Sequence, residues 1–218
     1  MSSAAATDLF REGLLADVRM LVAGPEAAPG TVESEGFASA IEDGCTALGA
    51  KVVACPISHD SSPELQEQEV ERIVYDAMEQ LDAIELLVVD GDGLLRAARA
   101  RGEEREALAS CLDQAWSITR ALAARAFIAT EAPGRIVYVA PASGPSMAEG
   151  HREVARAAFE NLSRTLSIEW ARYGITPLTI APGTSTSPQE VASLTAYLAS
   201  PAGAYFSGCL LDLRGPAN

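Results

Sequence analysis

The chain has little positive charge and few of the side chains that bind metals. It carries 16 Lys and Arg residues against 30 Asp and Glu residues, so its net charge is −14. A surface this acidic repels nucleic-acid phosphates and anionic lipids, so we expect neither nucleic acid nor membrane as a partner. Its two histidines and four cysteines do not cluster in the sequence, and no metal site is predicted.

Targeting segments and long apolar runs are also missing. The first residues, MSSAAATDLFREG, contain no basic stretch followed by an apolar run, so no signal peptide is predicted. No segment approaches the roughly 20 apolar residues of a membrane-spanning helix. Without a C-x-x-C pair, Cys45, Cys55, Cys111 and Cys209 are interpreted as buried, reduced thiols of a cytoplasmic protein.

What the sequence does contain is a regular alternation of short apolar runs and helical patterns. This alternation is typical of a parallel sheet covered by helices. Strands are predicted at residues 18–23, 51–55, 84–89, 135–139, 176–180 and 209–213, and a turn at Asp90–Gly93. Helices are predicted at residues 36–48, 63–81, 107–128, 151–173 and 188–199. We therefore predict one α/β domain over residues 1–218, with a three-layer, Rossmann-like, doubly wound parallel sheet of six strands, helices on both faces and a loose tail at 1–10.

Five segments with recognisable patterns are distributed along the chain between Gly13 and Gly215. They are GLLADVRMLVAG, AIEDGCTALGAKVVAC, AIELLVVDGDG, EWARYGITPLTIAPG and ASPAGAYFSGCLLDLRG. In this order and at these spacings they resemble the short-chain dehydrogenase/reductase family. The resemblance implies the Rossmann-like fold and, for an active member, NAD(P)-dependent oxidation or reduction. Because one fold hosts many functions, the function has to be argued from the site.

At the positions aligned with the family's catalytic residues, this chain carries residues of other types. The family's serine position falls on Pro141, its tyrosine on Arg152, its lysine on Arg156 and its asparagine on Cys111. A guanidinium stays protonated at neutral pH, so Arg152 cannot exchange a proton as a tyrosine does. We predict no catalytic residue at these positions and interpret the two arginines as part of an outer or interface surface.

The cofactor-binding segments differ from the family pattern as well. The family's glycine-rich turn places bare backbone and a helix N-terminus against a pyrophosphate. Here the turn positions fall on Gly24, Gly36 and Ala38, with the acidic insertion PEAAPGTVESE between them. Glutamates near two phosphates would repel them, so no cofactor is expected from this degenerate turn. A lengthened turn of the enoyl-reductase type is the alternative that would retain NAD(P).

Two further parts of the family's cofactor and substrate sites are changed. After the second predicted strand, Pro56-Ile57-Ser58 stands where an NAD enzyme carries an acid and an NADP enzyme an arginine. The family's further helix and strand, which wall the adenosine site, have no counterpart here. After Gly183, the residues TSTSP lead directly into the last predicted main helix, which leaves no lid.

Other side chains near the altered positions have plainer interpretations than catalysis. His151 is expected to be exposed at a helix start, Tyr138 to pack against a helix, and Ser143 and Ser146 to lie in an ordinary loop. The mixed arginines and glutamates of residues 96–106 either bind a phosphate or coenzyme A tail or form ion pairs on a helix face.

Features that join subunits in the family are retained. The predicted helices 107–128 and 151–173 resemble those that pair subunits in family tetramers, and they carry small residues suited to close packing. The leading hypothesis is a catalytically degenerate protein that serves as a structural or regulatory subunit. It would form a homo-oligomer or pair with an active hydroxyacyl or ketoacyl dehydrogenase. The alternatives are an NAD(P)-dependent oxidoreductase acting on a carbonyl or hydroxyl substrate with relocated catalytic groups, and a cofactor-free binding or sensor module.

Overall fold

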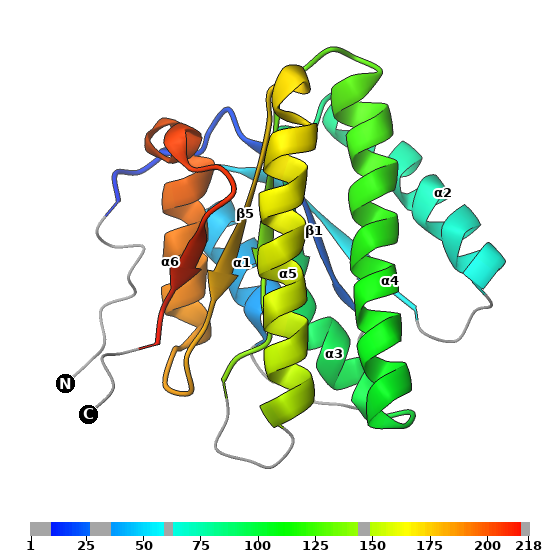
Figure 1. Cartoon of the computed structure of the whole chain (residues 1–218). Helices are drawn as coiled ribbons and strands as arrows, with labels where there is room; N and C mark the ends of the chain where they lie inside the picture. The colour runs from blue at the N-terminus through cyan, green and yellow to red at the C-terminus, as the bar shows by residue number, and fades with distance from the viewer. Residues whose placement is uncertain (1–9, 27–35, 59–62, 144–148, 215–218) are drawn as a thin grey trace.

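The computed structural model describes residues 10–26, 36–58, 63–143 and 149–214 (Figure 1). They form one sheet of six parallel strands flanked by helices, which confirms the predicted Rossmann-like fold. The strands are β1 (Arg19–Pro25), β2 (Lys51–Ile57), β3 (Leu86–Asp90), β4 (Gly134–Val139), β5 (Ile175–Ala181) and β6 (Leu210–Asp212). Their order across the sheet is β2-β1-β3-β4-β5-β6.

Helices cover both faces of this sheet. They are α1 (Phe37–Ala47), α2 (Pro63–Leu81), α3 (Gly91–Arg99), α4 (Glu104–Leu122), α5 (Glu149–Glu169) and α6 (Pro188–Ala199). One face is covered by α1 and α6, and the other by α2, α4 and α5 (Figure 1). Successive strand side chains point to opposite faces, so Leu21 and Leu87 belong to the core cluster beneath α2, α4 and α5, whereas Val22 and Val88 belong to the cluster beneath α1 and α6. Among the described residues, no helix is long and apolar enough to cross a membrane.

The turn predicted at Asp90–Gly93 is wrong, because these residues begin helix α3. Asp90 is the N-cap, and its carboxylate accepts a hydrogen bond from the Gly93 N–H at 2.9 Å. The first N–H groups of a helix have no partner within the helix, so a carboxylate at this position stabilises the helix start. The structure thereby fixes two acids, Asp90 and Asp92, at the end of the sheet where the strands end.

The predicted helices 107–128 and 151–173 are both present, and each ends in an irregular turn. Helix α4 continues into a π-helical turn at Ala123–Ile128, and α5 is followed by a 3-10 turn at Ala171–Tyr173. The helices lie side by side on the sheet (Figure 1). The tail predicted at residues 1–10 lies outside the described residues except for its last position.

Candidate functional site

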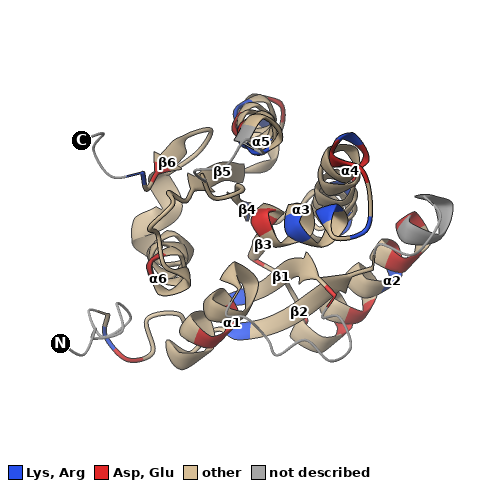
Figure 2. Cartoon of the chain, turned by 90° about the horizontal axis from the view of Figure 1, so that it is seen from below, with Lys and Arg blue, Asp and Glu red and all other residues tan. Residues whose placement is uncertain are grey.

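The carboxyl ends of β1, β3, β4 and β5 meet the first turns of α1, α3 and α5 at one end of the sheet. Open α/β sheets bind their ligands at this end. Seen from this end, the acidic start of α3 lies next to β3 near the centre of the molecule (Figure 2). The aligned family positions Cys111, Pro141, Arg152 and Arg156 are brought together here through their contacts with α3 and with the strand ends.

Asp90 is a buried carboxylate that joins two helix N-termini. It is 1% exposed, and besides Gly93 it accepts a hydrogen bond from the Ala38 N–H, in the first turn of α1, at 3.2 Å. Burial, followed by the nearby charge of Asp92, raises the pKa of Asp90 to about 6. The α1 donor that the family's turn would direct at a pyrophosphate is thus already bonded to a side chain of the protein.

The predicted turn positions are partly assembled around this carboxylate. Gly36 is the N-cap residue of α1, and Gly24 lies in β1 against the first turn of that helix. A Cβ added to Gly24 would lie 3.0 Å from the Cβ of Ala38, so strand and helix pack closely there. Residues 27–35, which include Glu33 and Glu35 of the insertion, lie outside the described residues.

Asp92 holds Arg152 against the loop that follows β4. The Asp92 carboxylate accepts hydrogen bonds from the Ala142 N–H at 2.9 Å and from Arg96 Nε at 2.8 Å. Arg152 Nη1 lies 3.4 Å from the same carboxylate and donates to the Ala142 carbonyl at 3.1 Å. The position of the family's tyrosine is therefore part of an ion-pair network that links α3, α5 and the β4 loop.

Arg156 is buried, which corrects the interpretation of the two arginines as an outer surface. It is 5% exposed, and its Nη1 donates to the carbonyls of Pro141 and Pro182, each at 2.7 Å. Glu153 at 3.6 Å and Asp212 at 3.9 Å balance its charge. Burial lowers the pKa of this guanidinium from its usual value. The long side chain reaches inward because the two carbonyls at the strand ends need donors.

Cys111 lies at the family's asparagine position as a buried thiol. Its Sγ donates to the carbonyl of Gly91 at 3.5 Å. Burial, with smaller effects from Asp90 and Asp92, raises the pKa of Cys111 to about 12, so the reactive thiolate is not formed at neutral pH. Of the predicted buried thiols, Cys209 is only partly buried; the other three are buried, and all four are free.

The alternative acid–base side chains lie at the margin of this crevice. His151 is partly exposed, with Nδ1 3.8 Å from a Glu104 carboxylate oxygen. The Ser143 hydroxyl lies 3.5 Å from a Glu153 carboxylate oxygen. Ser146 lies outside the described residues. No Ser–His contact is present among the described residues of this loop.

Tyr138 packs in the core, and arginines that follow β3 form ion pairs within the protein. The Tyr138 hydroxyl is 3.1 Å from that of Thr119, and its ring packs 5.6 Å from the ring of Phe159, which confirms the predicted packing against a helix. Burial raises the pKa of Tyr138 above its usual value. Arg99 pairs with Glu104, and Arg96 with Asp92, so ion pairs account for these members of the charged segment.

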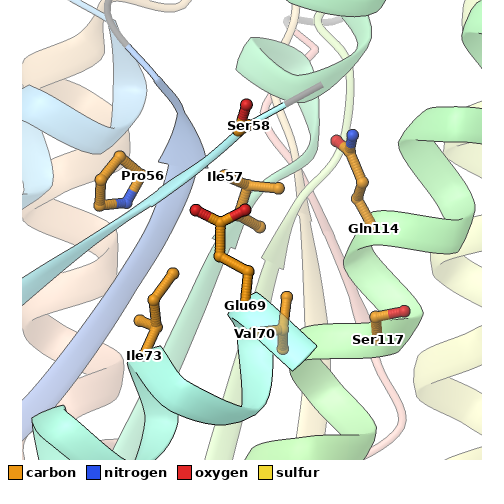
Figure 3. Close-up of a pocket in the computed structure, with 8 residues that line it drawn as sticks. All are labelled: Pro56, Ile57, Ser58, Glu69, Val70, Ile73, Gln114 and Ser117. Atoms are coloured by element: carbon orange, nitrogen blue, oxygen red, sulfur yellow. The ribbon is translucent and has the colours of Figure 1, made fainter. Parts of the chain in front are cut away.

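The adenosine side of the crevice contains a small cavity at the end of β2. Strand β2 ends at Pro56 and Ile57, and Ser58 follows it, beside a cavity that α2 and α4 close from the other side (Figure 3). Its volume is about 10 Å³, room for about one water molecule, and its walls include Val70 and Gln114. In the described part of the chain, this cavity is far too small for an adenine ring.

The connection from β5 to α6 is short, as predicted. It ends at Ser187, whose hydroxyl accepts the Glu190 N–H while the Glu190 carboxylate accepts the Ser187 N–H. This capping box begins α6 directly after the turn that follows Gly183. No helix or strand lies between β5 and α6 in these described residues.

The same arrangement of elements occurs in solved dehydrogenases. A citronellol catabolism dehydrogenase from Pseudomonas aeruginosa PAO1 is 23% identical with a TM-score of 0.70, over 95% of this chain and 98% of that one. A short chain dehydrogenase from Mycobacterium smegmatis is 21% identical with a TM-score of 0.70, over 98% and 100% of the two chains. The fold is that of the short-chain dehydrogenases.

A third neighbour was solved with a nicotinamide cofactor. It is a 3-ketoacyl-(acyl-carrier-protein) reductase from Brucella melitensis complexed with NADH, 17% identical with a TM-score of 0.70, over 91% of this chain and 97% of that one. No family model and no curated protein matches this sequence. At these identities the likeness establishes the fold, and the chemistry depends on the side chains at the site.

Sequence reasoning missed the two acids that organise this site. The sequence pattern predicts a turn at Asp90–Gly93 and no contact for either acid. Two signals pointed to them: an acid directly after a buried strand, in helix N-cap position, and Arg96 four residues after Asp92, at the spacing of a helical ion pair.

Proposed function

We propose that this chain is a catalytically inactive protein with the short-chain dehydrogenase fold that serves as a structural or regulatory subunit. The observation that carries the proposal is the network of Arg152 and Arg156 with Asp92 and two strand-end carbonyls. It occupies the place where the family resemblance puts tyrosine and lysine. The side chains at these positions carry permanent charges that link neighbouring elements, and they do not transfer protons.

The three side chains at the centre of this network, those of Arg152, Cys111 and Asp90, are not suited to proton transfer to a substrate at neutral pH, and the partly exposed His151 lies at the margin beside Glu104. Arg152 stays protonated, and Cys111 is a buried thiol with a pKa of about 12. Asp90, with a pKa of about 6, is bonded to two backbone N–H groups and 1% exposed, so a substrate has no access to it. General acid–base catalysis needs a group within reach of the substrate and with a pKa near the working pH.

Cofactor binding is disfavoured by the same arrangement. A pyrophosphate at the start of α1 would have to displace the Asp90 carboxylate from the Ala38 N–H. If Asp90 stayed in place and ionised, two like charges would face each other in a partly desolvated site. The cavity of about 10 Å³ between β2, α2 and α4 is too small to hold adenine.

A subunit contact is supported by the exposed face of α5. Val154, Ala157, Asn161, Thr165 and Ile168 form an uncharged exposed stripe along this helix, with Val154 53% and Ile168 79% exposed. Exposed apolar side chains that line up on one face are typical of an interface. The spacing is symmetric about Asn161, so the helix can pack antiparallel against a second α5 of this chain or of a chain with the same fold.

The second candidate is a working NAD(P)-dependent oxidoreductase. It is favoured by the NADH complex of a protein with the same fold. Cofactor titration separates the two candidates. NADH and NADPH are added to the chain while nicotinamide fluorescence and Tm are followed. We expect no saturable binding up to about 1 mM, the upper end of usual KM values. The Brucella reductase is the positive control. Saturable binding in the micromolar range would replace the proposal by the second candidate.

Assembly is tested by a substitution that introduces a charge into the exposed stripe of α5. Light scattering on the purified chain detects a homo-oligomer, and native pull-down detects a different partner chain. Ile168→Asp should abolish either association, because it buries an unpaired carboxylate in the contact. Tyr75→Asp, at an exposed apolar position on α2, is the matched control and should leave assembly intact. Equal behaviour of the two variants contradicts an interface at α5.

A further inference from the structure

Strand β2 is the last strand of the sheet, and its outer edge has no partner strand among the described residues. Lys51 donates its N–H to the Val18 carbonyl at 2.9 Å, toward β1. Backbone groups alternate in direction along a strand that pairs on one side. Val52 and Ala54 therefore direct both their N–H and their C=O groups away from the sheet, where an added strand would meet them.

The part of this edge that can pair is short, and the residues at its two ends limit which strands can be added. Pro56 has no N–H, so pairing cannot extend past it on that side. Lys51, the only lysine of the chain, stands exposed at the other end. Both features discourage indiscriminate strand pairing. An occupant has to fit the few residues between them.

A groove runs between this edge and helix α2, which lies beside β2 (Figure 2). Its volume is about 230 Å³, and Val53 and Ala54 of β2 line one side. Ile73 and Ala77 of α2 line the other side. The base of the groove is thus apolar and is bounded by an unpaired strand edge.

The rim of the groove is acidic. Glu26, Glu69 and Asp76 line it, and Arg72 is its one basic side chain, paired with Asp76 at 3.0 Å. Neither Glu26 nor Glu69 has an ion-pair partner in the part of the chain that the structure describes. The Glu69 carboxylate points from α2 toward the end of β2 (Figure 3). An acidic partner is repelled here, and a second copy of this chain would bring the same acids face to face.

We propose that this groove binds an extended segment of a partner protein, which joins the sheet beside β2 and carries basic residues two positions before and after an apolar one. Alternate side chains of an added strand face the same side, so all three would point toward α2. The apolar side chain would rest on Val53, Ile73 and Ala77. The basic ones would meet Glu69 and Asp76.

The spacing of the acids is close enough to that of the basic residues for long, flexible Lys or Arg side chains to reach both acids. Glu69 and Asp76 are seven residues apart on α2, which is about 10 Å along a helix. Residues two before and two after the apolar position of a strand are about 13 Å apart. The exposed Arg72–Asp76 pair is a surface pair, and such pairs contribute little stability, so a basic residue of the partner can replace Arg72.

A displayed library of random decapeptides, selected against the whole chain, tests this proposal. We expect enrichment of basic–x–apolar–x–basic sequences. Fluorescence anisotropy then measures binding of an enriched peptide to the wild type, to Glu69→Gln and to Glu169→Gln, an equal charge change at an exposed position of α5. Glu69→Gln should weaken binding about 2- to 5-fold, the upper range for one partly exposed ion pair, and Glu169→Gln should not change it.

The backbone pairing is tested on the peptide, so that the protein is not disturbed. N-methylation of the alternate residues that face Val52 and Ala54 removes the donated N–H groups and should weaken binding at least about tenfold. N-methylation of the residues between them should have little effect. Failure to enrich the pattern, or equal effects of both methylation sets, would overturn the proposal.

Discussion

Replacing Arg156 by leucine should destabilise the protein far more than the same change elsewhere on α5. The change removes two charge-assisted hydrogen bonds of 2.7 Å to the carbonyls of Pro141 and Pro182. Bonds of this kind contribute about 1.5–3 kcal/mol each, and burying a leucine side chain returns about 1.5–3 kcal/mol. Pro182 still accepts a bond from the Ser143 N–H at 3.2 Å, whereas Pro141 loses its donor. We expect a net loss of about 3 kcal/mol in the free energy of unfolding.

Urea unfolding followed by tryptophan fluorescence measures this loss. Trp116 and Trp170 stack with 6.3 Å between ring centroids, so their emission reports the packing of α4 against the end of α5. In a chain of this size, about 3 kcal/mol corresponds to a fall in Tm of about 6–12 °C. The slope against urea should not change, because the variant exposes the same surface on unfolding.

Arg164→Leu is the matched control for this experiment. Arg164 lies on the same helix, is mostly exposed and pairs with Glu160 at 2.7 Å. Exposed pairs of this spacing contribute about 0.3–0.5 kcal/mol, so the control should lose little. If Arg156→Leu lost less than about 1 kcal/mol, or no more than the control, the burial and bonding assigned to Arg156 would be refuted.

Two further predictions concern the start of α3. The pKa of Asp90 is raised from 3.8 to about 6, so the folded state binds the proton more tightly and stability should fall as pH rises from about 4 through 6, by on the order of 3 kcal/mol. Asp90→Asn should remove that component from an unfolding-versus-pH profile, and an unchanged profile would show that another group titrates. Gly93→Ala should cost more than about 2 kcal/mol in chemical denaturation, because its Cβ would lie 2.6 Å from Asp90 Oδ2 and 2.8 Å from Pro25 Cδ. Gly102→Ala, whose Cβ would meet only Glu106 at 3.6 Å, should cost far less, and equal losses would argue against the close packing at Gly93.

The fold could be predicted because its signals are local. Leu86–Val89 is an unbroken apolar run, and all of it is buried in the centre of the sheet. A strand covered on both faces needs apolar side chains on both sides, so a continuous apolar run predicts a central strand of the sheet. The same reasoning predicted six strands and the packing of Tyr138. It failed at Asp90–Gly93, because two glycines favour a turn unless a capping side chain and close packing make them a helix start.

The sequence by itself determined the fold class and the chemical types of the side chains at the aligned positions. A guanidinium at Arg152 holds its proton whatever surrounds it, so that property needs no structure. Only the tertiary structure decided what those side chains do. Arg156 bonds to a carbonyl 26 residues away, and Asp90 to an N–H 52 residues away. Such contacts between residues far apart in the sequence form only when the fold brings the strand ends together. Local sequence patterns therefore do not predict them.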